Sequence, residues 1–105
     1  MGSKFLKNIK ISGAEIGLVS KDLSEVVAEK LELTETRLSF TVYQKKPEFG
    51  PANMIVEAHV LDNIEKLYMV DVLSSLSINE KVVKDKILNV EEKLYEVEFG
   101  KSSKE

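Results

Sequence analysis

Two hydrophobic periodicities follow one another along this chain in a fixed order, and that order limits the folds available to it. Apolar and polar residues alternate over residues 5–12, 38–43 and 54–60, which indicates half-buried β-strands. Residues 67–73 are a mainly apolar run that we also predict to be a strand. Between the first two of these segments, and again after the last, apolar residues recur every three or four positions, which indicates amphipathic helices. The sequence therefore predicts the order strand, helix, three strands, helix.

The two predicted helices have well-defined apolar faces. The first covers about residues 21–32, and its face consists of Leu23, Val26, Val27 and Leu31. The second begins near Ser77, which forms a capping-box pattern with Glu80. Its face is a stripe over about five turns, made of Val83, Ile87, Val90, Leu94 and Val97.

Short connections join the three consecutive strands, namely a turn at 45–51 and another at 62–63, so we expect an antiparallel meander. No internal repeat is evident. The predicted fold is an α+β, β-α-β-β-β-α two-layer sandwich, with both helices on one face of a four-stranded sheet. Residues 1–105 form a single domain, with flexible termini at 1–4 and 99–105. The other face of the sheet is then open and carries Ser39, Thr41, Tyr43, Glu57, His59, Met69 and Asp71.

Composition narrows the classes of protein further. The 105 residues include no cysteine, which excludes disulfides and thiolate metal sites and suits a reducing cytoplasm. No apolar run is long enough to span a membrane, and no secretory signal peptide is evident. The net charge of −3 provides no general attraction to nucleic acid or to anionic lipid.

Catalytic chemistry is sparse. His59, the one histidine, shares a predicted strand face with Glu57, and Asp71 is expected on the next strand. This group could form a metal site or an acid–base pair, but its spacing matches no diagnostic pattern, and a solvated polar patch is the simpler interpretation. We therefore expect a protein that is not an enzyme and has no cofactor, metal or small-molecule substrate.

Lysines are the candidate binding residues. Lys45 and Lys46 lie beside Tyr43 and Phe49, and charge next to an aromatic ring can hold RNA. The predicted outer helix faces carry many carboxylates among their lysines, so most of these charges are expected to be solvated surface. Seven residues apart on one flank of the last helix, Lys86 and Lys93 form the best remaining pair.

Three segments resemble one known family in order and spacing. Residues 9–16 (IKISGAEI) are similar to the opening strand of the ribosome hibernation-promoting and ribosome-associated inhibitor family. Residues 23–31 (LSEVVAEKL) resemble its first helix, which ends in Glu-Lys-Leu, and residues 87–94 (ILNVEEKL) resemble its last helix. The resemblance covers about residues 5–98, in a short form of the family.

The resemblance implies a non-enzymatic stress-response factor that binds the small ribosomal subunit, in the channel used by messenger and transfer RNA, and inhibits or hibernates translation. Basic side chains on the helices and the adjoining sheet edge would contact ribosomal RNA. Carried over by position, these are Lys30, Lys86 and Lys93, with Lys84 adjacent and Lys21 on the first helix.

Two alternatives stay open. A protein-binding adaptor with the same fold would dock a partner on the open sheet face, through Tyr43, His59 and Met69, or on an exposed Leu88. Residues 21–97 also follow the helix, three-strand, helix order of a double-stranded-RNA-binding domain, although its basic cluster is reduced here to Lys81 and Lys84.

Overall fold

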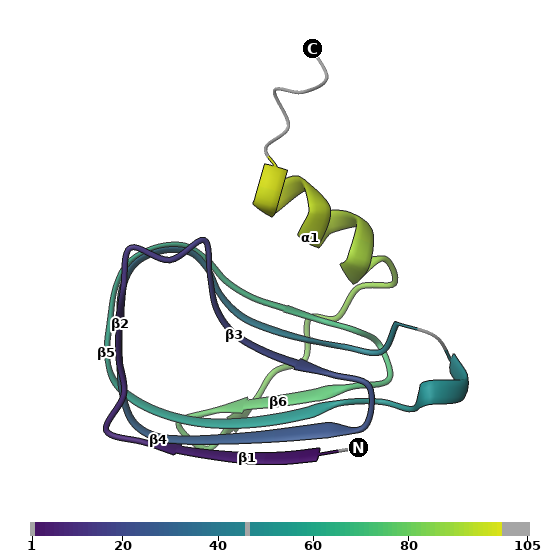
Figure 1. The fold of residues 1–105 in the computed structure, drawn as a ribbon, viewed down its shortest axis with the longest axis horizontal. Coiled ribbons are helices and arrows are strands. Elements are labelled where there is room, and N and C mark those ends of the chain that lie inside the picture. The colour runs from purple at the N-terminus through teal and green to yellow at the C-terminus, as the bar shows by residue number, and fades with distance from the viewer. Residues whose placement is uncertain (1, 46, 100–105) are drawn as a thin grey trace.

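The computed structural model describes residues 2–45 and 47–99, and most of them belong to one curled, seven-stranded mixed sheet (Figure 1). One α-helix and one 3₁₀ turn complete the described part of the chain. The elements are β1 (Gly2–Lys7), β2 (Lys10–Ser12), β3 (Ile16–Lys21), β4 (Ser24–Tyr43), η1 (Pro47–Phe49), β5 (Asn53–Val70), β6 (Ser75–Ile78), β7 (Lys81–Val82) and α1 (Val90–Phe99).

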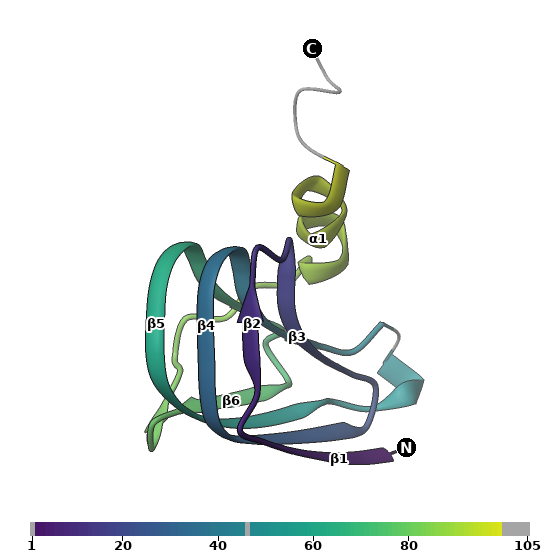
Figure 2. The same ribbon diagram turned by 60° about the vertical axis from the view of Figure 1, so that its left-hand side comes forward.

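Parallel pairing at a constant separation makes the chain a short β-solenoid. Gly2 pairs with Ser24 and Lys21 pairs with Tyr43, so 22 residues separate the paired positions along all of β1, β2 and β3. β5 lies parallel to β4 with a separation of 28 residues at most paired positions, as between Glu25 and Asn53, and β6 lies parallel to the start of β5 with a separation of 22. Each circuit of the chain therefore stacks on the one before it, as the side-by-side β2, β4 and β5 show in Figure 2.

Three walls enclose the interior of each circuit (Figure 1). We define the lower wall as β1, residues 24–29 of β4, residues 53–57 of β5, and β6. The side wall contains β2 and the middle of β4 and β5, and the upper wall contains β3 and the last parts of β4 and β5. On the remaining side the upper and lower walls converge at the turns between circuits.

Residues with positive φ form the corners between walls. Asn8 (φ 57°) and Lys30 (φ 55°) occupy equivalent positions between the lower and side walls. Gly13, Glu35 and Asn63 (φ 52–74°) do the same between the side and upper walls. A left-handed residue bends the chain sharply, at a cost of about 1 kcal/mol for a residue other than glycine. β4 and β5 continue through their corners, whereas Asn8 and Gly13 separate β1, β2 and β3.

Stacked aliphatic side chains fill the interior. In the lower wall, Val26, Met54 and Leu76 occupy one paired row and all three are buried. Phe40, Val42 and Val70 reach the same core from the upper wall, and Leu31 and Leu33 from the side wall. Helix α1 packs on the outside of the upper wall, where Val90 joins Leu38, Tyr43 and Met69 in a second buried cluster.

This structure corrects the predicted α+β sandwich. Residues 21–32 form the start of β4 and not a helix, because Val26, Ala28, Leu31 and Leu33 face the core in two alternating pairs on either side of the corner at Lys30. The corner adds one residue, so the inward positions Ala28 and Leu31 are three apart, a spacing that also fits a helix.

The predicted antiparallel meander is also wrong. Residues 62–63 do not reverse the chain, because Asn63 is a corner within the continuous β5 and the pairing remains parallel. A repeat is present in the geometry, with paired positions 22 residues apart, although the sequence shows none. The loop predicted at 45–51 is present and contains η1, with Lys46 outside the described residues.

The last predicted helix is shorter than expected. Ser77 and Glu80 belong to the β6–β7 hairpin, and α1 begins only at Val90. Val90, Leu94 and Val97 still share the packed face of the helix, as predicted. Of the termini expected to be flexible, residues 2–4 lie in β1, whereas residues 100–105 lie outside the described range.

Candidate binding edge

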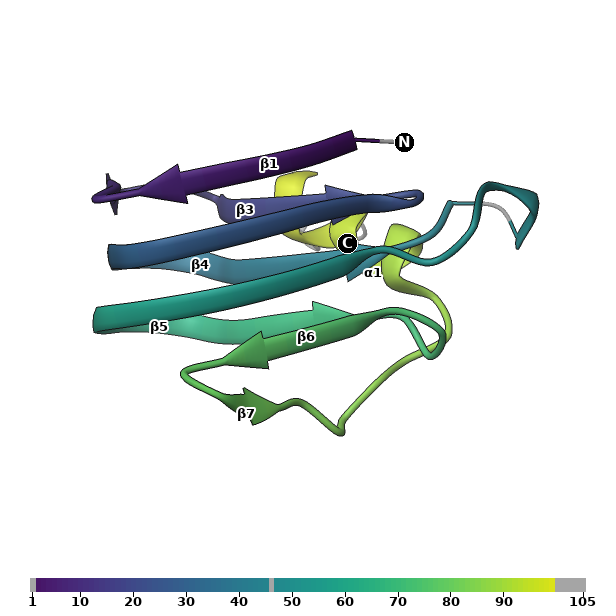
Figure 3. The same ribbon diagram turned by 90° about the horizontal axis from the view of Figure 1, so that it is seen from below.

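The first circuit leaves one edge of the sheet without a neighbour in the described part of the chain. β1, β2 and β3 each pair with β4 on one side only, and β1 is at the end of the strand order (Figure 3). Alternate backbone N–H and C=O groups along such a strand point away from the sheet and can pair with another strand. We call the outer side of β1, β2 and β3 the open edge.

Aliphatic side chains that face the interior are incompletely covered at the open edge. Leu6, Ile9, Ile11 and Leu18 pack against the core but are only half-buried, whereas Ala28 and Phe40, which pair with Leu6 and Leu18 in the next circuit, are fully buried. A further strand laid along the open edge would cover them, as β4 covers its neighbours.

On the outer surface of the lower wall, a row of apolar side chains also extends to the open edge. Phe5 pairs with Val27, and Val27 pairs with Ile55. Phe5, at the end of the row, is 61% exposed. The open edge therefore presents apolar groups on both faces of β1.

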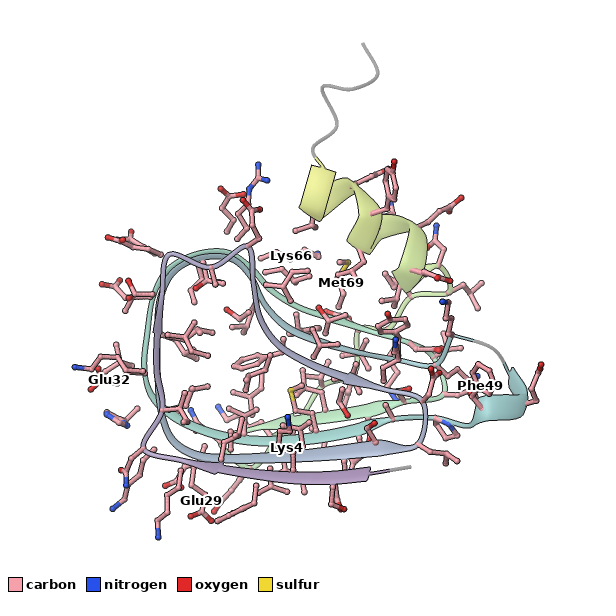
Figure 4. All side chains as sticks on the ribbon, in the orientation of Figure 1. Lys4, Glu29, Glu32, Phe49, Lys66 and Met69 are labelled. Atoms are coloured by element: carbon pink, nitrogen blue, oxygen red, sulfur yellow. The ribbon has the colours of Figure 1, made fainter. Side chains whose placement is uncertain are left out.

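Lys4 interrupts the apolar interior at the open edge. It pairs with Val26, in the row of inward residues that continues through Met54 and Leu76. Figure 4 shows its side chain within the outline of the circuit, on the inner side of β1. The residue is exposed, and no carboxylate of the described residues lies within salt-bridge distance of it.

Charge is distributed unevenly between circuits. Residues 2–21 contain four lysines and one glutamate, a net charge of +3. Residues 24–43 contain four glutamates against one lysine and one arginine, a net charge of −2. Residues 53–70 carry three carboxylates against one lysine, which is also −2 with the histidine neutral. The open edge is thus a basic end on an otherwise acidic solenoid.

Basic and acidic side chains alternate across the circuits in two outer rows. Glu32 lies between Lys10 and His59, 3.6 Å from the Lys10 Nζ and 3.2 Å from the His59 Nε2. Arg37 lies between Glu15, at 3.2 Å, and Glu65, at 3.9 Å. Lys7 similarly pairs in register with Glu29, and opposite charges on adjacent strands favour pairing.

The opposite end of the solenoid is closed. β7 folds back on β6, and Val83 is buried in the core just beyond it. The Asn79 side chain pairs with the edge of β5, because the Ala58 N–H donates to the Asn79 Oδ1 (2.8 Å) and the Asn79 Nδ2 donates to the Ala58 carbonyl (3.1 Å). The Ile87 N–H donates to the Val70 carbonyl at 2.9 Å, so the chain that leads to α1 also covers this end.

The lysines predicted to bind RNA lie on several different elements. Lys21 ends β3, Lys30 is a corner of β4, and Lys93 lies on α1. Lys45 is in the loop after β4, 4.0 Å from Glu91, and Lys46 lies outside the described residues. Lys84 and Lys86 lie in the connection between β7 and α1, so Lys86 and Lys93 do not share a helix flank.

The predicted open sheet face does not form in this fold, and of its residues only Glu57 and His59 are exposed. Tyr43, Met69 and Asp71 are buried, together with Ser39 and Thr41, and Figure 4 shows Met69 directed towards α1. His59 contacts Glu32 and lies on a different wall from Asp71. No group of three or more potential metal ligands occurs among the described residues.

Comparison with models of protein families, with curated proteins and with solved structures finds no match for this chain. The resemblance to the hibernation-factor family therefore stays a prediction. Within residues 2–45 and 47–99, no helix is long and apolar enough to cross a membrane.

Lys4, Lys7 and Lys10 are absent from the binding residues predicted from sequence. The sequence did contain a pattern that could have indicated them. Three lysines follow one another at intervals of three, in a stretch whose net charge is opposite in sign to that of the whole chain. The topology was needed to show that this stretch is an edge, and that Lys4 occupies an inward position.

Proposed function

We propose that the protein is a non-catalytic protein-binding module that takes up an extended segment of a partner along the open edge. The observation that carries the proposal is the difference between the two ends of the solenoid. One end is closed by a hairpin, by the Asn79 side chain and by Val83, whereas no element among residues 2–45 and 47–99 covers the strand edges and half-buried aliphatic residues at the other.

Strand addition is the binding mode that this surface supports best. Main-chain groups of an edge strand supply affinity in that mode, and alternate side chains supply specificity. A second copy bound edge to edge is a poorer occupant, because it would oppose two surfaces of net charge +3 at short range.

Selection from a random peptide library tests the proposal. Peptides selected by the purified protein should slow amide hydrogen exchange along β1, β2 and β3. Leu6→Lys should weaken their binding, because it places a second charge at the half-buried interior of the edge. Leu88→Lys is the matched control, since Leu88 is 85% exposed in the connection before α1.

Three results would contradict the proposal. One is that no selected peptide slows exchange at the open edge, and another is that protection falls on β5, β6 or α1 instead. The third is dimerisation of the protein alone in sedimentation equilibrium, with protection of the same strands, which would identify a second copy as the occupant.

Binding to the small ribosomal subunit stays a separate prediction, based on the resemblance of three sequence segments. It predicts saturable cosedimentation with small subunits that weakens as salt is added, because counterion release drives contacts with phosphate. The double variant Lys86→Glu, Lys93→Glu should abolish cosedimentation without changing thermal stability. Absence of binding at low salt would exclude this function.

A further inference from the structure

We infer that the segment bound at the open edge is acidic, with a carboxylate facing Lys4 and an aliphatic side chain facing Leu6. This inference rests on the proposed function and specifies the chemistry of its partner. It follows from the register of the first circuit together with the alternation of charge between circuits.

Register fixes which partner side chains face inward. Lys4 and Leu6 are two residues apart on β1 and pair with the inward residues Val26 and Ala28 of β4. A strand paired with the other side of β1 repeats this alternation, because side chains on paired strands lie on the same face. Its inward residues then lie over Lys4 and Leu6, at positions two apart.

The Lys4 ammonium determines which side chain is favoured at the partner position that faces it. Addition of a strand there removes water from a lysine whose neighbour in the inward row is the buried Val26. An unpaired charge in such a place opposes binding, and a carboxylate placed against it restores a favourable interaction. A neutral strand of the same shape would leave the charge uncompensated.

The outward positions favour the same sign of charge. On β1 and β2, Lys7 and Lys10 pair in register with Glu29 and Glu32. Continuing this alternation by one strand places acidic residues beside Lys7 and Lys10. Beside Phe5, where the outer apolar row ends, the partner would carry an apolar residue. Parallel pairing, the orientation of every strand beside β4, gives the pattern acidic, apolar, aliphatic, acidic along the partner.

Three synthetic peptides that differ at one position test the inference. The first is Val-Thr-Glu-Ile-Val-Glu-Thr, aligned so that its first Glu faces Lys4. The second carries Gln at that position, which keeps the shape and removes the charge, and the third carries Lys. We expect the Glu peptide to bind about tenfold more tightly than the Gln peptide, as judged by titration calorimetry. The Lys peptide should bind most weakly.

A charge exchange separates recognition by Lys4 from a general effect of basic charge. Lys4→Glu should reverse the order, so that the Lys peptide binds best. Lys81→Glu changes the net charge of the protein equally, but at the closed end in β7, and should leave the order unchanged. A lysine that only prevents edge-to-edge aggregation would produce no reversal.

The possible failures are distinguishable. Equal binding of the Glu and Gln peptides, with slowed exchange along β1, would overturn the inference and leave the proposed function standing. No binding of any peptide at the open edge, after library selection has also failed, would overturn both. Tighter binding of oligouridine than of the Glu peptide, sensitive to Lys4→Glu, would assign the basic edge to nucleic acid and contradict the inference.

Discussion

Asn79 shows how a single side chain can end a β-solenoid. Its amide group replaces the backbone of a further strand residue, since it both accepts from and donates to the peptide groups of Ala58. The left-handed backbone at Asn79 (φ 50°) then starts the turn into β7. Asparagine suits both roles, because it tolerates positive φ and carries a donor and an acceptor.

Asn79→Ala should therefore destabilise the protein more than most substitutions of a solvent-exposed residue do. We expect a loss of about 1–3 kcal/mol in the free energy of unfolding, from two lost hydrogen bonds and a residue less suited to positive φ. Urea denaturation measures it. Glu80→Ala is the control, since Glu80 has the same backbone geometry (φ 71°) in the same turn. Equal losses in the two variants would show that the two Asn79 hydrogen bonds contribute little to stability.

Tyr68 provides a pH-dependent test of the closed end. Burial raises the pKa of its phenol above the ordinary value of 10.0, and the nearby Asp85 carboxylate, which accepts its hydrogen bond at 3.4 Å, raises the pKa further. The folded state thus favours the protonated phenol. Its contribution to stability is complete below pH 10.0 and is lost as the pH rises through the folded-state pKa.

Above the ordinary pKa, the wild-type protein should therefore lose stability more steeply with pH than Tyr68→Phe does. Asp85→Asn should fall between them, because it removes the charge and leaves the burial. Urea denaturation over an alkaline pH series measures the slopes. Parallel curves for wild type and Tyr68→Phe would show that neither burial nor Asp85 raises the pKa of Tyr68 in solution, and equal slopes for wild type and Asp85→Asn would show that Asp85 does not contribute.

At the scale of elements, α1 is held to the upper wall by one face of the helix. Val90, Leu94 and Val97 pack against a cluster that includes Leu38 and Met69. The Arg37 guanidinium donates to the Val97 carbonyl at 3.1 Å, near the C-terminal end of the helix. A helix of this length is marginal in water, so its stability comes mainly from this contact.

Leu94→Ala should detach or loosen α1, whereas Leu88→Ala should have little effect. We expect a loss of about 1–2 kcal/mol for the half-buried Leu94, from the apolar surface that it contributes. Leu88 is 85% exposed, so the same substitution there should change stability by less than about 0.5 kcal/mol. Thermal unfolding followed by circular dichroism measures both. A larger loss at Leu88 would contradict the exposure of this side chain in the connection before α1.

For the whole molecule, stacked circuits predict a gradient of stability. In a solenoid each unit is stabilised mainly by its neighbours. β4 has paired strands on both sides along most of its length, whereas β1, β2 and β3 have them on one side only. The outer circuit should therefore open locally at lower free energy than the middle one.

Amide hydrogen exchange should show this gradient directly. Amides of β4 should exchange most slowly, and those of β1, β2 and β3 faster under the same conditions. Addition of the Glu peptide should reduce the difference, because it provides the outer circuit with a second neighbour. Equal protection of β1 and β4 in the isolated protein would instead indicate that the open edge is already covered in solution.

Local pattern was enough to identify several parts of this protein. Alternation at 38–43 and 54–60 marked true strand segments, the Pro- and Gly-containing stretch at 45–51 marked a loop, and the spacing of Val90, Leu94 and Val97 marked the packed face of α1. These features depend on residues that are only a few positions apart in the sequence. The periodicity of apolar side chains reflects such short-range relations well.

Only the tertiary structure decided the path of the chain and the location of the open edge. A corner residue such as Lys30 shifts the alternation by one, so two strand segments in succession carried the spacing of a helix. Parallel stacking depends on contacts between residues 22 or more apart, which local periodicity does not encode. The sequence by itself determined that lysines follow one another at 4, 7 and 10. The fold made them a basic edge, because β1 and β2 pair on one side only with other described strands.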